Sequence, residues 1–125
     1  MTASDAPLIA VVDDDASVLE AISNLLASAQ YAVACFDSAE SFIEDMIVRH
    51  FDCLITDIGL PGLSGVALQT QTGLVLPELP VILITGRNDY GAGASTAFNN
   101  RGLFRKPFDA RELLGAVRAA IKATC

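Results

Sequence analysis

Acidic residues, a hydroxyl and an amine follow short apolar runs in this sequence, and together they could carry out phosphoryl transfer. Three consecutive aspartates come after LIAVV, a fourth closes CLITD, a threonine ends PVILIT, and a lysine follows LFR. These residues are Asp13, Asp14, Asp15, Asp57, Thr85 and Lys106. A carboxylate can attack phosphorus to form an acyl phosphate, while a hydroxyl and an ammonium group can bind the oxygens of the transferred group.

Such a group of carboxylates needs a cation if its members meet in the fold. Two unit charges about 4 Å apart repel by on the order of 4 kcal/mol at an effective dielectric constant of about 20. One lysine cannot balance three carboxylates. An acidic site built from oxygen ligands suits Mg²⁺, which also binds the phosphate of a substrate. The residue types therefore predict a Mg²⁺-dependent site.

Each member also has an ordinary structural explanation. Asp15 is the best candidate for the N-cap of a following helix, and we favour that role over metal binding. Thr85 could simply end a strand, and Lys106, before a proline, could be solvated. Asp57 is the least ordinary, because an acid that closes a buried strand costs free energy without a partner. The combination, in order at successive strand ends, favours a functional site.

The elements that must position these residues alternate between strand and helix. We expect strands at 8–12, 31–36, 53–56, 80–85 and 103–105. We expect helices at 16–29, after Ser38, from about Ser64 to Thr72, at 89–99 and after Asp109. Alternating units of this length form a parallel sheet with helices on both faces, a doubly wound α/β fold. Its ligand site lies beyond the carboxyl ends of the strands, which is where the polar residues fall.

Apolar spacing predicts which helix faces are buried. The first helix should bury Val18, Ile22, Leu25 and Leu26, and the second Phe42, Ile43, Met46 and Ile47. Glu112 stands at the capping-box position after Asp109. The segment 89–99 contains two glycines and is a poor helix sequence.

Length and composition limit the class of protein. The 125 residues suit one domain, 1–125, in which residues 1–6 should form a flexible tail. No leader sequence or run of about 20 apolar residues occurs, so we expect a soluble, cytoplasmic protein without a membrane partner. The net charge of −7 argues against direct nucleic-acid binding.

The cysteines and the single histidine carry no chemistry that we can identify. Cys35, Cys53 and Cys125 have no paired spacing, and the first two lie in apolar strand-like runs where a thiol acts as a small hydrophobic group. We expect none to be a metal ligand, nucleophile or disulfide partner. His50 should be a solvated surface residue.

The motifs together resemble the receiver domains of two-component response regulators, with the CheY-like fold and strand order 2-1-3-4-5. The matching stretches are VVDDD at 11–15, ITDIGLPGLSG at 55–65, VILITG at 81–86 and FRKPF at 104–108. TDIGLPGLSG and LITG most resemble FixJ-type receivers. The resemblance covers essentially the whole chain.

The resemblance implies a role for each matching residue. Asp57 would be the phosphoacceptor, Asp14 a direct Mg²⁺ ligand, and Asp13 a ligand acting mainly through water. The backbone carbonyl of Gly59 would complete the metal shell. Thr85 would be the switch hydroxyl and Lys106 its ion-pair partner. These assignments imply a sensor histidine kinase as phosphodonor and a cis bond between Lys106 and Pro107.

Three features depart from the usual receiver pattern. Leu103 stands where a switch aromatic is common, and Phe104 falls one place later, on the opposite face of the strand. Gly59 replaces a residue with a side chain, which predicts a more open phosphoryl site and altered hydrolysis of the acyl phosphate. The helix expected at 89–99 is weak. The usual output surface, formed by 89–99, 103–105 and the last helix, could still mediate homodimerisation.

Two other functions remain open at this stage. A Mg²⁺-dependent phosphohydrolase would use an aspartyl nucleophile, but it needs a second acid two residues later, where this chain has Gly59. We therefore do not expect a turnover enzyme. A receiver that has lost its switch could act as a phosphorylation-independent interaction module. FixJ-type receivers usually precede a DNA-binding domain, and the sequence leaves open whether one follows residue 125.

Overall fold

The fold is a five-stranded parallel sheet with helices on both faces, as seen in a computed structural model that describes residues 6–60, 62, 64–85, 100–105 and 109–124. The strands are β1 (Leu8–Val12), β2 (Ala32–Phe36), β3 (Cys53–Asp57), β4 (Val81–Thr85) and β5 (Asn100–Arg105). The helices are α1 (Ala16–Ser28), α2 (Ala39–Met46), α3 (Gly65–Val75) and α4 (Ala110–Thr124). Across the described residues the strand order is β2-β1-β3-β4-β5, which confirms the predicted doubly wound fold.

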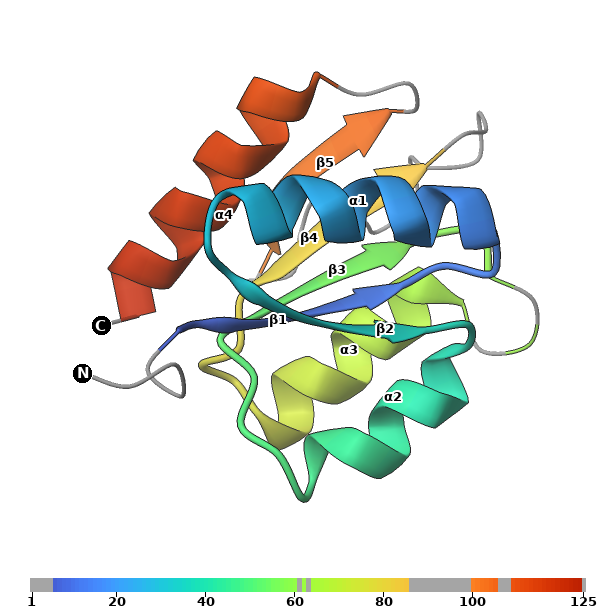
Figure 1. The fold of residues 1–125 in the computed structure, drawn as a ribbon. Helices are drawn as coiled ribbons and strands as arrows, with labels where there is room; N and C mark the ends of the chain where they lie inside the picture. Colours follow the sequence, from blue (N-terminus) through green and yellow to red (C-terminus); the bar gives the residue numbers. More distant parts are fainter. Residues whose placement is uncertain (1–5, 61, 63, 86–99, 106–108, 125) are drawn as a thin grey trace.

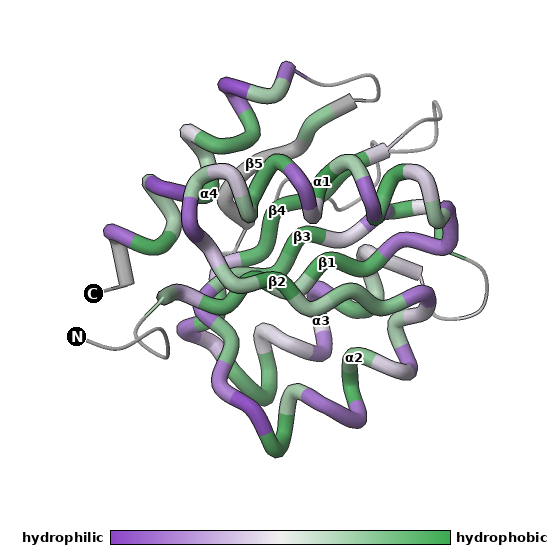
Figure 2. Tube along the Cα trace, in the orientation of Figure 1, coloured by the Kyte–Doolittle hydropathy of each residue, from purple (hydrophilic) through white to green (hydrophobic). Residues whose placement is uncertain are grey.

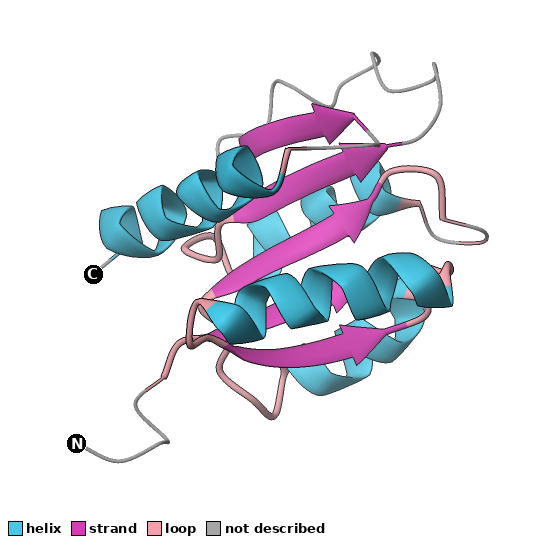
Figure 3. Cartoon of the chain, turned by 45° about the horizontal axis from the view of Figure 1, so that its top comes forward, coloured by secondary structure: helices cyan, strands magenta, loops and turns pink. Residues whose placement is uncertain are grey.

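Helices cover both faces of the sheet, whose strands are mostly apolar (Figures 2 and 3). Two buried apolar layers hold these helices in place. Successive strand residues face opposite sides, so a strand covered on both faces must be apolar throughout. Every residue of β3 and of β4 is buried. One layer, under α1 and α4, includes Ile22, Leu26, Leu113 and Val117. The other, under α2 and α3, includes Phe42, Met46, Phe51 and Leu68.

Side-chain caps start the helices where the sequence predicted them. Asp15 accepts a hydrogen bond from the Ser17 N–H at 2.9 Å. Ser38 and Ser64 accept from the third residue after each of them, both at 3.1 Å. Asp109 accepts from the Arg111 N–H at 2.8 Å. These bonds satisfy backbone donors that the first helical turn leaves without an acceptor.

Two element boundaries differ from the prediction by three residues. Helix α3 continues past Gly73 to Val75, because an internal glycine costs a helix only about 1 kcal/mol, and the Leu76 N–H closes the last turn on the Thr72 carbonyl at 2.7 Å. Strand β5 begins at Asn100 rather than Leu103, because pairing with buried β4 extends it despite its polar sequence. The helix expected at 89–99 lies outside the described residues.

Two burial predictions were wrong. Ile47 is 75% exposed and lies directly after the end of α2 at Met46. Cys35 is exposed on β2, the edge strand of the sheet, whereas Cys53 is buried as predicted. Within the described part of the chain, no helix combines the length and apolar character needed to cross a bilayer.

Candidate functional site

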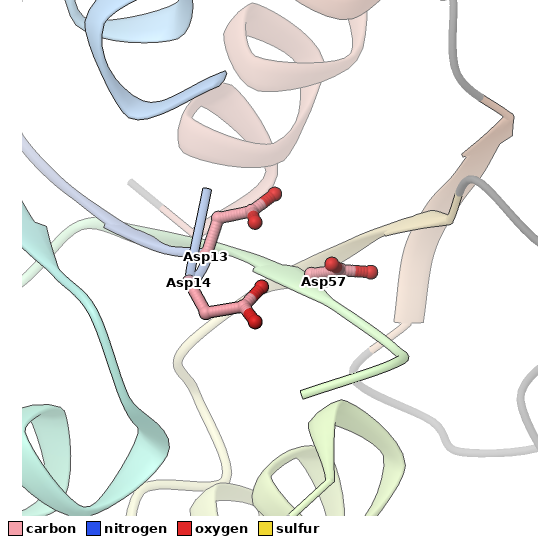
Figure 4. Close-up of side chains that lie close together, drawn as sticks. All are labelled: Asp13, Asp14 and Asp57. Atoms are coloured by element: carbon pink, nitrogen blue, oxygen red, sulfur yellow. The ribbon is translucent and has the colours of Figure 1, made fainter. Parts of the chain in front are cut away.

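Three aspartates from two strands meet at the carboxyl edge of the sheet (Figure 4). Asp13 and Asp14 directly follow β1, and Asp57 is the last residue of β3. Strands β1 and β3 are parallel neighbours, with Val12 beside Thr56, so their ends open at the same place. One carboxylate oxygen from each aspartate lies within 4.8 Å of the others. We call these three residues the aspartate triad.

Backbone contacts hold Asp13 in place. Its side chain is fully buried, and its N–H donates to the Phe36 carbonyl at the end of β2, at 3.1 Å. One carboxylate oxygen, Oδ1, accepts the Asp15 N–H at 2.9 Å. Asp14 is exposed. The triad therefore combines an anchored, buried acid with one that solvent and solutes can reach.

Asp57 is fixed by the strand it ends. It is 7% exposed, and the next residue, Ile58, donates its N–H to the Ile84 carbonyl of β4 at 2.8 Å. The Asp57 Oδ1 accepts the Gly59 N–H at 3.1 Å. A Cβ at position 59 would lie 3.9 Å from that same oxygen, so the glycine leaves the space beside the carboxylate open.

The structure places some of the other predicted residues at the same edge. Thr85 ends β4, is 1% exposed, and directly follows Ile84, which pairs with Asp57. The backbone of Leu103 pairs with Leu83 in the sheet. Phe104 packs into the layer under α1 and α4, as strand alternation predicted. The described part of the structure does not include Lys106, Pro107 or the side chain of Leu103. The roles of Leu103 and Lys106 and the cis Lys106–Pro107 bond therefore stay predictions.

The electrostatics of the triad favour a bound cation. Two of its three acids are buried, where unbalanced negative charge is most costly. The backbone N–H groups that donate to Asp13 and Asp57 lower this cost but carry no net charge. Three carboxylates at this spacing form an all-oxygen donor set, the type that hard divalent ions such as Mg²⁺ take. The residues present therefore fit the predicted metal.

The predicted exposure of His50 is confirmed, since 87% of its side chain is accessible. Its Nε2 lies 3.3 Å from Asp52 Oδ1, at the opposite edge of the sheet from the triad. Burial raises the pKa of the Cys53 thiol to about 12, which makes it unreactive at neutral pH. Cys125 lies outside the described residues.

Comparison with known proteins identifies a consistent set of relatives. The family model of the response regulator receiver domain matches residues 9–118. The response regulator protein TodT of Pseudomonas putida is 39% identical over 118 residues, which are 94% of this chain and 52% of TodT. The transcriptional regulatory protein FixJ of Bradyrhizobium diazoefficiens is 30% identical over 115 residues, covering 91% of this chain and 56% of FixJ.

Solved structures agree with these matches. A signal receiver domain from Pseudomonas fluorescens superposes with a TM-score of 0.89 at 27% identity, covering 95% of this chain and 97% of that one. Full-length FixJ from B. japonicum gives a TM-score of 0.86 at 28% identity, covering 94% of this chain and 59% of FixJ. The chain spans about half the length of the curated relatives it matches.

Proposed function

Since the chain belongs to the response regulator receiver domain family of two-component signalling, we propose that Asp57 is its phosphoacceptor and that Mg²⁺ supports the reaction. The observation that carries this proposal is the convergence of Asp13, Asp14 and Asp57 within 4.8 Å at the sheet edge. The donor would be a phosphohistidine on a sensor histidine kinase, because receivers of this family are phosphorylated by such kinases.

The chemistry at Asp57 is a displacement at phosphorus. A carboxylate oxygen of Asp57 forms a bond to phosphorus, and the bond between phosphorus and the donor's imidazole nitrogen breaks. The nitrogen keeps the electron pair of that bond and the products are an aspartyl phosphate and a free histidine.

The metal would be held by Asp13, Asp14, Asp57 and the Gly59 carbonyl. When bound, it would neutralise charge on the oxygens of the transferring phosphoryl group. Thr85 and Lys106 would bind those oxygens after transfer. Gly59 offers no acid to protonate a leaving group, so the domain would not be a turnover enzyme. The acyl phosphate would persist long enough to act as a signal.

Phosphorylation would change a protein-binding surface rather than a catalytic output. The added group brings negative charge and acceptor oxygens to the carboxyl edge of the sheet, where Thr85 ends β4. A surface that includes β5 and α4 would then bind a partner or a second copy. The relatives that match include transcription regulators. We therefore expect a cytoplasmic protein whose output is the control of transcription. The acidic chain itself would not bind DNA.

A phosphorylation-independent interaction module is the second candidate. The feature that favours it is β5, which carries Leu103 at the usual switch-aromatic position while Phe104 packs into the opposite layer. The triad and the buried Thr85 favour the signalling domain instead, because an interaction module needs neither.

One experiment separates these functions. The protein is incubated with Mg²⁺ and acetyl phosphate, and the intact mass is measured. A gain of one phosphoryl group is expected for the unaltered chain and for Asp52→Asn, whose carboxylate accepts the Leu8 N–H at the opposite edge of the sheet. No gain is expected for Asp57→Asn. If the unaltered chain gains no mass with acetyl phosphate or with phosphorylated kinases, the interaction module is the better account.

A further inference from the structure

The first residue of α3 lies against the backbone of the phosphoacceptor. Gly65 donates its N–H to the Ile58 carbonyl at 3.1 Å. A Cβ at this position would lie 2.0 Å from the Asp57 carbonyl oxygen, 2.7 Å from the Asp57 carbonyl carbon and 2.8 Å from the Ile58 Cα. Non-bonded carbon and oxygen atoms do not approach so closely, since contacts are optimal at about 3.5 Å or more. Only a residue without a side chain fits here.

Both sides of this contact are held by other parts of the molecule. The hydroxyl of buried Thr56 donates to the Asp57 carbonyl oxygen at 3.3 Å, and Ile58 is bonded to β4. On the helix side, the Ser64 Oγ caps α3 through the Ala67 N–H, and Leu68 is fully buried. The strand end and the helix start are therefore fixed relative to each other through Gly65.

We propose that Gly65 is a positioning residue for Asp57, a role that rests on the proposed function. The segment from Asp57 to Gly65 is closed at two places, by the bond from Gly59 to the Asp57 carboxylate and by the bond from Gly65 to Ile58. The close contact between the first residue of α3 and the Asp57 backbone determines where residues 58 and 59 lie. The segment in turn presents the Gly59 N–H that orients the Asp57 carboxylate.

A methyl group at position 65 would have to be accommodated by a shift of more than about 1 Å. Strand β3 is paired on both sides and buried, so it resists movement. Movement that relieves the contact therefore passes to Ile58, which joins Asp57 to Gly59, and it displaces the Gly59 N–H and turns the carboxylate. A misplacement of this size can cost on the order of 100-fold in rate.

The chain supplies a matched control on another helix. A Cβ at Gly115, an exposed position in α4, would meet nothing within 4 Å. Gly115→Ala therefore makes the same chemical change without a contact, and it should stabilise α4 because alanine favours the helix. It also provides a more stable background in which to study Gly65→Ala.

The experiment compares the unaltered protein, Gly115→Ala, and Gly65→Ala with and without Gly115→Ala. Labelling by acetyl phosphate is followed by intact mass and expressed per folded molecule, using the folded fraction from urea unfolding. In parallel, hydrogen exchange of the Gly59 amide is measured by NMR in metal-free protein. Gly65→Ala is expected to remain folded in the Gly115→Ala background, to label roughly 100-fold more slowly, and to exchange the Gly59 amide at least about tenfold faster.

Two results would overturn the proposal. One is a folded Gly65→Ala protein that labels at the control rate with an unchanged Gly59 amide, because the residue would then be structural only. The other is a Gly65→Ala protein that stays unfolded even in the Gly115→Ala background with added sucrose. In that case residues 58 and 59 would be unable to shift and relieve the contact with the new methyl group. Failure of the unaltered protein to label would count against the proposed function alone, since the amide measurement needs no phosphoryl transfer.

Discussion

The two edges of the sheet use the same residue type in opposite ways. At the amino edge, Asp52 precedes β3 and its Oδ2 accepts the Leu8 N–H at the start of β1, at 2.8 Å. Its other oxygen lies 3.3 Å from His50 Nε2. This single carboxylate joins two strand starts through one backbone donor, and a histidine side chain lies beside its other oxygen. At the carboxyl edge, the triad gathers three carboxylates that share one space.

The difference shows what distinguishes a functional acid from a structural one in this fold. Asp52 is a single, partly exposed carboxylate with a backbone donor at one oxygen, so its charge is compatible with its position. The triad brings three carboxylates together, two of them buried, and a divalent ion would offset the repulsion among them.

Removing the metal should abolish phosphorylation. With EDTA in place of Mg²⁺, acetyl phosphate should give no detectable labelling of the unaltered protein, because the cation that offsets the charge of the triad and the phosphoryl donor would be missing. Restoring Mg²⁺ should restore labelling. If intact mass shows undiminished labelling in EDTA, the proposal that the triad holds a metal needed for phosphorylation is wrong.

Removing one triad carboxylate should weaken metal binding. We expect Asp14→Asn to lower Mg²⁺ affinity by at least about tenfold, the cost that even outer-shell changes incur. Asp14 is exposed, so metal-free stability should be unchanged or higher as like-charge repulsion falls. Urea unfolding with and without Mg²⁺ measures both quantities. Equal stabilisation of the variant and the unaltered protein by Mg²⁺ would place the ion elsewhere.

Removing the acid at the other edge should affect stability alone. Asp52→Ala leaves the Leu8 N–H without its acceptor, which should cost about 1–3 kcal/mol of unfolding free energy. The pair with His50 adds little, because that side chain is exposed. Labelling per folded molecule should be unchanged. A loss of labelling would mean that the two edges are coupled.

The buried thiol at the start of β3 should make stability depend on alkaline pH. The pKa of Cys53 is raised from 9.0 to about 12 because burial disfavours the thiolate. The unfolded chain therefore loses this proton first, and folding stability falls above pH 9 by roughly 1.4 kcal/mol per pH unit, with no contribution below it. Cys53→Val should lack this part of the slope in urea unfolding measured at about pH 8 and about pH 10. Identical slopes would contradict the assignment.

The sequence was sufficient to predict the meeting of the triad. Parallel strands must open at one edge, and the positions of Asp13, Asp14 and Asp57 at strand ends follow from apolar runs alone. The caps at Asp15 and Ser38 were predictable for a similar reason, since they depend on residue type and local spacing.

Other features depend on contacts that the sequence does not encode locally. Gly65 resembled any glycine of a turn-rich loop, and only the packing of α3 on Asp57 distinguishes it from Gly62, whose φ of 72° requires glycine for conformational reasons. The extra turn of α3 after Thr72 and the early start of β5 arise from tertiary packing and sheet pairing. Lys106 remains a prediction from the motif.

Locating a divalent ion in the protein would test the proposed metal site most directly. Crystals grown with Mn²⁺, a substitute for Mg²⁺ with measurable anomalous scattering, should show one peak at the carboxyl edge with oxygens of Asp14 and Asp57 at about 2.1 Å. The amino edge around Asp52 should show none. No peak at saturating Mn²⁺, or a peak that these two aspartates do not contact, would contradict the account.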